Sequence, residues 1–270
     1  MKKIFKVFLI LGTCLLFIGG GIFLIAFAKV DFDIHALSAT KTKEERYEET
    51  SIVTSLSLEY TVADINVVAT DSEKLSVSYS CPYNRKGDIY EVSITEENGR
   101  LSIVEKTKQH VSLSFFNFYD HDVTVYVPKD RVLDIQIQTN TGDIKLGNGT
   151  FGKIDLETNT GDIVFGAITA TEISVSVDTG DVDFNGNVIA NTLTIETDTG
   201  DIDSNGVITA QTIKAETDTG DVELILSGKQ TDYTIIAKTN TGDQNIHSGG
   251  NGEKKLSVSC STGDIEIDFR

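Results

Sequence analysis

Seven aspartates follow a Thr-Gly pair at nearly constant spacing, and their carboxylates are the groups with the clearest chemical potential in this sequence. They are Asp143, Asp162, Asp181, Asp201, Asp221, Asp243 and Asp264. If the units that carry them stack in parallel, neighbouring carboxylates lie about 4.8 Å apart and repel one another unless each is neutralised or hydrogen-bonded. Either each Asp accepts a backbone N–H at its own corner, or the column binds Ca²⁺ through oxygen ligands. The first hypothesis is favoured, because the corners lack the Gly-Gly-x-Gly-x-Asp nonapeptide of calcium-binding β-rolls.

Catalytic motifs are hard to find among the other residues. The four histidines, His35, His110, His121 and His247, are scattered and form no His-x-x-x-His pair, and no nucleophile elbow is present. Some parallel β-helices act on polysaccharides with paired carboxylates, so such an enzyme is the alternative hypothesis. Its candidate here is the break in the repeat at Gln244–Asn245, close to His247. We predict no catalytic residue and no cofactor.

The aspartates belong to a repeat of 19 to 22 residues, a period typical of solenoid proteins. The glycines before them form a turn column at Gly142, Gly161, Gly180, Gly200, Gly220, Gly242 and Gly263. Apolar and polar residues alternate before and after each turn, as in strands with one buried face. Three coils add a third short apolar segment. We therefore predict an all-β parallel solenoid of about 20-residue coils over residues 131–270, its hand left open; the rival antiparallel meander does not explain identical columns at a fixed offset.

The alternation also predicts the core. The inward pairs before the turns are Ile135/Ile137, Ile154/Leu156, Ile173/Val175, Leu193/Ile195, Ile213/Ala215, Ile235/Ala237 and Leu256/Val258. A packing column of small or β-branched residues follows at Thr139, Thr158, Val177, Thr197, Thr217, Thr239 and Cys260. After the turns the inward pairs are Ile144/Leu146, Ile163/Phe165, Val182/Phe184, Val222/Leu224 and Ile265/Ile267. Ser204 and Gln244 interrupt this second column, so weaker packing is expected beside them.

Two further predictions concern the last coil. Cys260 lies in the inward column and is expected to be a buried free thiol, with a Cys81–Cys260 disulfide as the alternative. The alternating segment Ile265–Phe269 predicts a final strand whose outer edge is unpaired.

Residues 51–130 depart from the regular repeat. Ala63 takes the glycine position of a degenerate first coil, and Asn98–Gly99 predicts a tight β-hairpin. An aromatic cluster outside the array is favoured as a cover over the open N-terminal end of the stack; the alternative is a docking patch for a membrane partner or the bilayer surface. The cluster consists of Phe115, Phe116 and Phe118.

The first 28 residues have a different composition. Lys2, Lys3 and Lys6 precede an uncharged apolar run, Val7–Ala28, of the roughly 20 residues that cross a bilayer. We predict an uncleaved transmembrane anchor at residues 1–28 that leaves the repeats outside the cytoplasm, with a cleavable signal peptide as the alternative. Residues 29–50 are charged and predict a spacer.

The charge balance excludes some partners. With 41 acidic and 23 basic residues, the chain carries a formal net charge of −18. Such a surface repels nucleic acid and anionic lipid, so neither is an expected ligand.

The serial Thr-Asn/Asp-Thr-Gly-Asp-Ile/Val units, together with the anchor and the strand that ends in Val127–Pro128, resemble the bacterial "putative adhesin" β-strand repeat family, which includes LiaG-like proteins of cell-envelope stress operons. The resemblance covers roughly Ser51 to Arg270. It implies a membrane-tethered envelope protein that binds another protein or an envelope polymer, without enzymatic activity. The shared motif is a corner, so the resemblance implies no catalytic residue.

Overall fold

The computed structural model describes residues 2–29, 40–84, 87–108 and 121–270. Helix α1 (Lys2–Ala28) is followed in these ranges by β-strands and a 3₁₀ turn at Gln230–Asp232. Among the described residues no helix combines the length and the apolar character that a membrane span requires. Residues 2–28 are thus helical, but the structure does not support the predicted membrane-spanning role.

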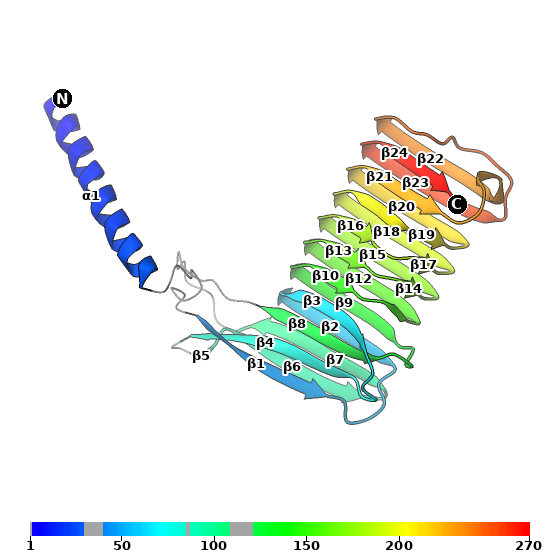
Figure 1. Cartoon of the computed structure of the whole chain (residues 1–270), viewed down its shortest axis with the longest axis horizontal. Coiled ribbons are helices and arrows are strands. Elements are labelled where there is room, and N and C mark those ends of the chain that lie inside the picture. The colour runs from blue at the N-terminus through cyan, green and yellow to red at the C-terminus, as the bar shows by residue number, and fades with distance from the viewer. Residues whose placement is uncertain (1, 30–39, 85–86, 109–120) are drawn as a thin grey trace.

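A ten-stranded sheet forms one long side of the molecule (Figure 1). Its strands, in chain order, are β2 (Ser55–Val62), β6 (Tyr90–Glu97), β7 (Arg100–Thr107), β9 (Asp134–Thr141), β12 (Lys153–Thr160), β15 (Glu172–Thr179), β18 (Thr192–Thr199), β20 (Thr212–Thr219), β22 (Tyr233–Thr241) and β23 (Lys254–Thr262). Their spatial order is β22-β23-β20-β18-β15-β12-β9-β2-β7-β6, and every pair except β6–β7 is parallel.

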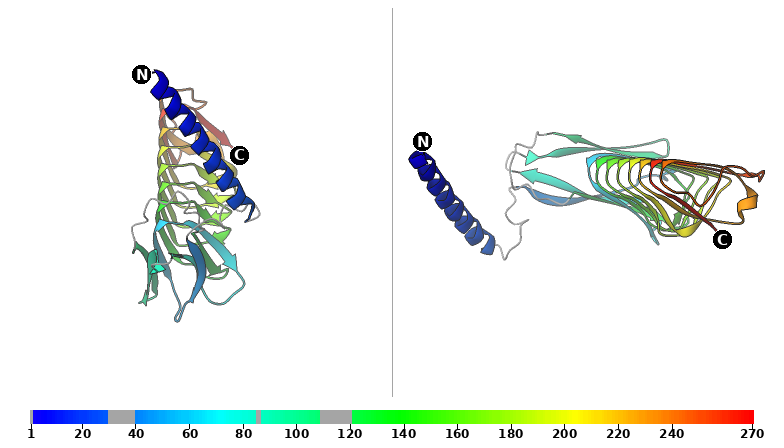
Figure 2. Two further views of the ribbon diagram at one scale, coloured as in Figure 1. Left: turned by 90° about the vertical axis from the view of Figure 1, so that its left-hand side faces the viewer. Right: turned by 90° about the horizontal axis from the view of Figure 1, so that it is seen from above.

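A fourteen-stranded sheet forms the remaining faces of the solenoid. Its strands are β1 (Lys41–Glu48), β3 (Asp64–Thr70), β4 (Ser76–Asn84), β5 (Gly87–Asp88), β8 (Asp122–Pro128), β10 (Ile144–Leu146), β11 (Gly149–Thr150), β13 (Ile163–Phe165), β14 (Ile168–Thr169), β16 (Val182–Phe184), β17 (Val188–Ile189), β19 (Ile202–Thr209), β21 (Val222–Leu226) and β24 (Ile265–Phe269). The short strands β11, β14 and β17 make a third face, which joins the second face where β19 spans both. Figure 2 shows the faces as layers around a common interior, so the predicted parallel solenoid is confirmed.

The interior is the predicted core. Ile195 is fully buried in β18, with Val175 and Ala215 in register on the two neighbouring strands. The rings of Phe165 and Phe184 stack with their centroids 4.8 Å apart. All inward pairs listed above are buried, so the alternation assigned the strand faces correctly.

The turn column needs glycine for two reasons. Gly200 has φ of +150°, and a Cβ there would lie 1.9 Å from the carbonyl oxygen of Gly180 in the preceding coil. A side chain at Gly142 would meet the carbonyl oxygen of Ala63 in the same way, at 2.0 Å, so Ala63 does occupy the glycine position of a first coil. The coils can therefore approach to strand distance only if the corner has no side chain.

At the N-terminal end the pairing changes from parallel to antiparallel. β1 pairs with β4, β4 pairs with β8, and β6 pairs with β7 across the predicted Asn98–Gly99 hairpin, where both turn residues have positive φ. Residues 41–48 of the expected spacer therefore form a strand of the body. Phe115, Phe116 and Phe118, as well as His35 and His110, lie outside the described residues.

The C-terminal end differs from the prediction. β23 pairs with β20 on one side and with β22 on the other, although β22 precedes it in the sequence. β24 pairs with β21, and beyond it the Asn245 side chain donates to the Ile267 carbonyl at 3.2 Å and accepts the Ile267 N–H at 2.9 Å. The prediction of an unpaired outer edge on the final strand is wrong, because the preceding coil folds over it.

Cys81 and Cys260 are both free thiols. Cys260 is buried in β23, and its thiol donates to the Gly263 carbonyl at 3.0 Å. Cys81 lies in β4, in the N-terminal part of the stack, so the alternative Cys81–Cys260 disulfide is not formed.

Candidate binding surfaces

The Asp column forms a ladder of hydrogen bonds along one corner. From Asp64 to Asp264, the Oδ1 atom of each Asp accepts the backbone N–H of the Asp in the neighbouring coil, at 2.7–3.1 Å, and Asp243 ends the ladder as a donor. The ladder runs through Asp64, Asp143, Asp162, Asp181, Asp201, Asp221, Asp264 and Asp243, in that spatial order. The carboxylates thus have the structural role of joining coils. Within the described residues, no group of three or more His, Cys, Asp or Glu side chains could hold a metal ion.

The packing column before the turn supports the same corner. The hydroxyls of Thr197 and Thr217 donate to the carbonyls of Gly180 and Gly200 at 3.3 and 3.0 Å. Cys260, in the same column, donates its thiol to the Gly263 carbonyl of its own coil instead. Sequence reasoning assigned this column to packing alone and missed the hydrogen bonds, although threonine is the residue that supplies both a methyl group and a donor.

The outer face of the ten-stranded sheet is a flat polar surface. Its columns continue in register through β9, β12, β15, β18 and β20. Lys214 lies between Glu196 and Glu216, with Nζ–Oε distances of 2.6 and 2.8 Å, and Glu157 is exposed in the same column as the two glutamates. Because both edges of each strand are paired to rigid neighbours, these side chains are displayed at fixed spacing.

The second face carries an acidic column that the sequence analysis did not single out. Asp183, Asp203, Glu223 and Glu266 are register partners on successive strands. Partial burial, and then the neighbouring carboxylates of Glu223 and Asp201, raise the pKa of Asp203 to about 6. Burial also raises the pKa of Asp183. The acidic residues lie two positions after Asp181, Asp201, Asp221 and Asp264, and the column they form becomes visible only when the coils are aligned strand by strand.

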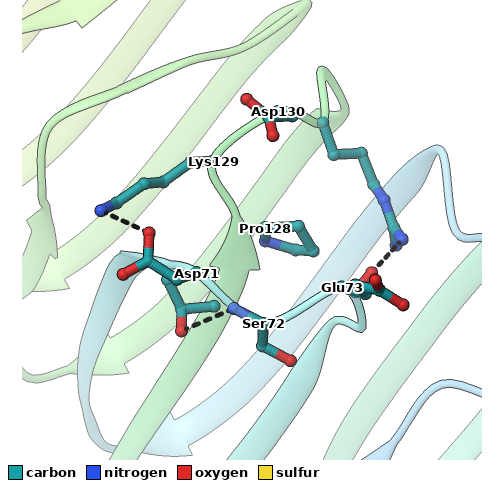
Figure 3. A pocket seen from close by; sticks show the side chains of 8 residues that line it. Asp71, Ser72, Glu73, Pro128, Lys129 and Asp130 are labelled. Atoms are coloured by element: carbon teal, nitrogen blue, oxygen red, sulfur yellow. Dashed lines mark hydrogen bonds and ion pairs between the residues drawn. The ribbon is translucent and has the colours of Figure 1, made fainter.

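A surface hollow of about 460 Å³ lies between two loops at the N-terminal end (Figure 3). Lys129 reaches across it to Asp71, with Nζ–Oδ1 of 2.8 Å, and the guanidinium of Arg131 donates to the Glu73 carbonyl at 2.8 Å. Arg131 also binds the buried carboxylate of Glu49. Sequence reasoning missed this hollow because its two loops are about 58 residues apart. Its cations are already paired, so no ligand is assigned to it.

A buried contact between a histidine and a carboxylate lies close to the same end. His121 Nε2 is 2.6 Å from Glu105 Oε1, and both side chains are almost completely buried. The rings of Tyr60 and Tyr90 lie 6.2 and 4.7 Å from the imidazole. The Glu105 carboxylate also accepts the Thr61 N–H, so Glu105 on β7 contacts both β2 and the residue before β8.

The enzyme candidate at the repeat break has a structural explanation. Asn245 pairs with the backbone of Ile267, and the Gln244 backbone makes an isolated bridge to Ile265. His247 is exposed on the loop that follows. The break in the repeat is where the chain covers the edge of β24.

The comparisons with known proteins agree with this geometry. The family model described as Toastrack DUF4097 matches residues 53–269, which is most of the chain. The chain belongs to the Toastrack DUF4097 family. A "putative adhesin" from Bacteroides fragilis has the same fold, with a TM-score of 0.54, 16% identity, and coverage of 84% of this chain and 97% of that chain. The resemblance to the "putative adhesin" family is thereby confirmed.

Two other solved structures are similar to this toastrack protein. A "putative cell adhesion protein" from Clostridium sporogenes has 17% identity and a TM-score of 0.32, and covers 85% of this chain and 100% of that one. A "putative adhesin" from Parabacteroides distasonis has 13% identity and a TM-score of 0.43, and covers 84% and 97%. A search among curated proteins finds no match.

Proposed function

We propose that this toastrack protein is a non-enzymatic binding protein of the bacterial envelope that presents an acidic β-sheet surface to a cationic partner. The observation that carries the proposal is the outer face of the ten-stranded sheet, which is flat, polar and regular over five successive parallel strands. A net charge of −18 favours association with positively charged protein or polymer surfaces, because complementary potentials speed encounter and exclude wrong partners.

The proposed location is outside the cytoplasmic membrane, with α1 as the tether. The lysines that precede the apolar run support this orientation. The side chains of Leu15, Leu16 and Phe17 on α1 are 63%, 78% and 79% exposed, and so large an apolar surface requires cover. Digestion of intact cells with a protease tests the location: the repeats should be cut while a cytoplasmic control protein stays whole. Protection of the repeats in intact cells contradicts it.

A role during envelope stress belongs to the same proposal and rests on the family resemblance alone. Deleting the gene should change the growth of cells under a cell-wall antibiotic but not in unstressed medium. Equal growth of the deletion strain and its parent under the antibiotic removes this part of the proposal.

The binding test compares two acidic surfaces of equal charge. In one variant, Glu157, Glu196 and Glu216 on the ten-stranded sheet become Gln. In the matched control, Asp183 and Asp203 become Asn and Glu223 becomes Gln, on the second face. Photo-crosslinking of the full chain in native membranes should capture a partner, and capture should weaken at high salt. The first variant should reduce capture at least tenfold and the second less than twofold.

Two outcomes contradict the proposal. If neither variant changes capture, the acidic faces do not bind the partner. If the full chain turns over envelope glycans and one substitution abolishes the reaction, the protein is an enzyme.

A further inference from the structure

The two sheets end unevenly at the N-terminal end of the stack (Figure 1). Beyond the coil β2–β3, the ten-stranded sheet continues through β7 and β6, whereas the fourteen-stranded sheet continues through β8, β4 and β1. Glu105 on β7 contacts His121 beside β8, and the Ile89 N–H before β6 donates to the Pro82 carbonyl on β4, so β7 faces β8 and β6 faces β4. β1 therefore extends one strand beyond β6. We call the open position next to β6, opposite β1, the strand slot.

The strand slot is bordered by an unpaired strand edge. Within the described part of the chain, β6 pairs with β7 alone. Glu97 and Arg100 flank the two-residue turn of this hairpin and form a hydrogen-bonded pair, so the N–H and C=O groups of Val92 and Ile94 point away from β7. The side chains of Val92 and Ile94, like that of Tyr47 on β1, pack on the core but are only half-buried. A strand in the slot would satisfy these backbone groups and cover these side chains.

The edges at the C-terminal end are covered by the chain itself. Gly249 and Ile235 on β22 exchange backbone hydrogen bonds at 2.7 and 2.9 Å, and Asn245 pairs with Ile267 on β24. No described residue covers β6 in this way. The two ends of the stack therefore differ in their capacity to accept another strand.

A second copy of the chain carries a strand that fits the slot. The charged residues of β6 are all acidic, so pairing of β6 with another β6 would place like charges together. The charged residues of β1 are of both signs, three basic and three acidic, and its outer edge is also unpaired in the described residues. β1 is also the strand by which one sheet exceeds the other, so two copies can each fill the slot of the other.

The strand directions agree with this exchange of edges. β6 is antiparallel to β2, and β1 runs parallel to β3, because the pairs β1–β4 and β4–β8 are both antiparallel. Since the chain reverses between β2 and β3 at Ala63, β1 and β6 run in the same direction. A twofold axis along the strands keeps that direction. The hydroxyl of Tyr47 donates to Glu96 at 2.7 Å, so these residues lie level along the strands, and the axis brings Glu44 of one copy beside Ser93 of the other.

We propose that two copies of this chain form an end-to-end dimer in which β1 of each copy pairs in parallel with β6 of the other. The fourteen-stranded sheet of one copy then continues into the ten-stranded sheet of the second copy, and the interface is isologous. Lys41, where the chain enters the body, lies at the same end of the axis in both copies, so both α1 helices leave on one side. The dimer does not depend on the function proposed above.

Crosslinking between chains with one cysteine each tests the pairing. Glu44 and Ser93 are exposed on the outer faces of the two different sheets, so they cannot meet within one copy. One chain carries Glu44→Cys and a differently tagged chain carries Ser93→Cys. The matched control for the second chain is Ser176→Cys, on the outer face of β15. All chains are full-length, and their native cysteines are replaced by Cys14→Ser, Cys81→Ser and Cys260→Thr.

The chains are mixed in mild detergent and oxidised. The Glu44→Cys and Ser93→Cys chains should form a covalent dimer carrying both tags, at least tenfold more than the Glu44→Cys and Ser176→Cys chains. Each chain oxidised alone should give no more dimer than the control. Equal yields in the test and control mixtures, or dimers mainly between identical chains, overturn the proposal.

Two variants test the edge without cysteines. Val92→Pro removes an N–H that faces the strand slot, whereas Val92→Ala shortens the same side chain and keeps the N–H. In native mass spectrometry the natural protein should be a dimer that dissociates on dilution. Dissociation should occur at a concentration at least tenfold higher for Val92→Pro than for Val92→Ala. A natural protein that is monomeric at every concentration, or equal dissociation of the two variants, overturns the proposal.

Discussion

At the N-terminal end of the stack, the coil β2–β3 lies between the coils β7–β8 and β9–β10, although both of these follow it in the sequence. At the C-terminal end, β23 lies between β20 and β22, which both precede it. In each case the coil nearest a chain end has paired strands on both sides, and its neighbour in sequence forms the outer layer. Because an outermost coil opens most easily, this arrangement protects the coils that would otherwise fray.

The two outer layers use different chemistry. The N-terminal layer is closed by antiparallel strands, by the buried ion pair Glu49–Arg131 and by the buried contact between Glu105 and His121. The C-terminal layer is closed by a loop that makes neutral hydrogen bonds through its backbone and through Asn245. Removal of one partner of a buried charged pair strands the other charge, whereas a neutral bond at an edge can be replaced by water. The N-terminal end should therefore be the more sensitive to single substitutions.

The largest expected effect lies between the two ends. Ile195→Asp places a carboxylate in the fully buried core of the middle coils and should cost roughly 3–5 kcal/mol. Ile235→Asp changes the adjacent inward column in the outermost coil, where local opening can expose the charge. Hydrogen exchange should report loss of protection throughout the stack for the first variant and only over residues 233–252 for the second. An unchanged melting temperature for Ile195→Asp would show that the strand register is wrong.

Arg131→Ala tests the N-terminal end. Burial opposes ionisation of Glu49, but hydrogen bonds from Arg131 and from the Leu75 and Val53 N–H groups hold its pKa below the ordinary value. Without Arg131 this carboxylate is left charged and buried, at an expected cost of about 3 kcal/mol in urea unfolding. The matched control is Lys129→Ala, which removes an exposed pair with Asp71 and should leave the urea midpoint nearly unchanged. Similar losses in the two variants would contradict the assigned role of burial.

Asn245→Ala makes the corresponding change at the C-terminal end. Two hydrogen bonds to the Ile267 backbone are lost at a partly exposed edge, so the expected cost is about 1 kcal/mol. Exchange of the Ile267 amide should accelerate at least fivefold. Asn245→Asp keeps the acceptor for the Ile267 amide and loses the donor to the Ile267 carbonyl. The Ile267 amide should therefore exchange more slowly in the Asp variant than in the Ala variant. Equal exchange in all three proteins would show that the loop does not cover this edge.

The difference between the ends also explains what the sequence could predict. The repeat fixed the corner glycines, the strand faces and the parallel stacking, because the same local pattern recurs in every coil. The order of the terminal coils was not predictable, since the last coil carries the same Thr-Gly-Asp corner wherever it inserts. The sequence shows the Asn245 pairing only as an interruption of the repeat. The sequence analysis interpreted this interruption as the candidate site of the alternative enzyme hypothesis. The hollow beside Lys129 depends on two loops that follow β3 and β8, and these loops are close because Thr70 and Pro128 are register partners in that parallel pair.

The smallest expected effect concerns the body of the stack. Here the carboxylate of Asp203 opposes folding, whereas at the N-terminal end the carboxylate of Glu49 stabilises the outer layer. The folded-state pKa of Asp203, about 6, exceeds the ordinary 3.8, so the folded protein binds a proton more tightly than the unfolded chain. The contribution of this group to stability is complete below about pH 4 and is lost as the pH rises through 6. At pH 7 Asp203→Asn should therefore stabilise the protein, by ~1 kcal/mol once solvent screening at this half-exposed position is allowed for.

Urea unfolding between pH 4 and pH 8 measures the effect. The natural protein should lose stability through this range more steeply than the Asp203→Asn variant, because the variant no longer releases this proton. Asp198→Asn is the control, since that aspartate is exposed at a corner position where other coils carry asparagine. If Asp198→Asn flattens the pH dependence as much as Asp203→Asn, the effect comes from net charge alone and the acidic column of the second face has no special role. If only Asp203→Asn does so, the carboxylates of the body oppose stacking while the buried pair at Glu49 supports it, and the same charge type acts in opposite directions in the two regions.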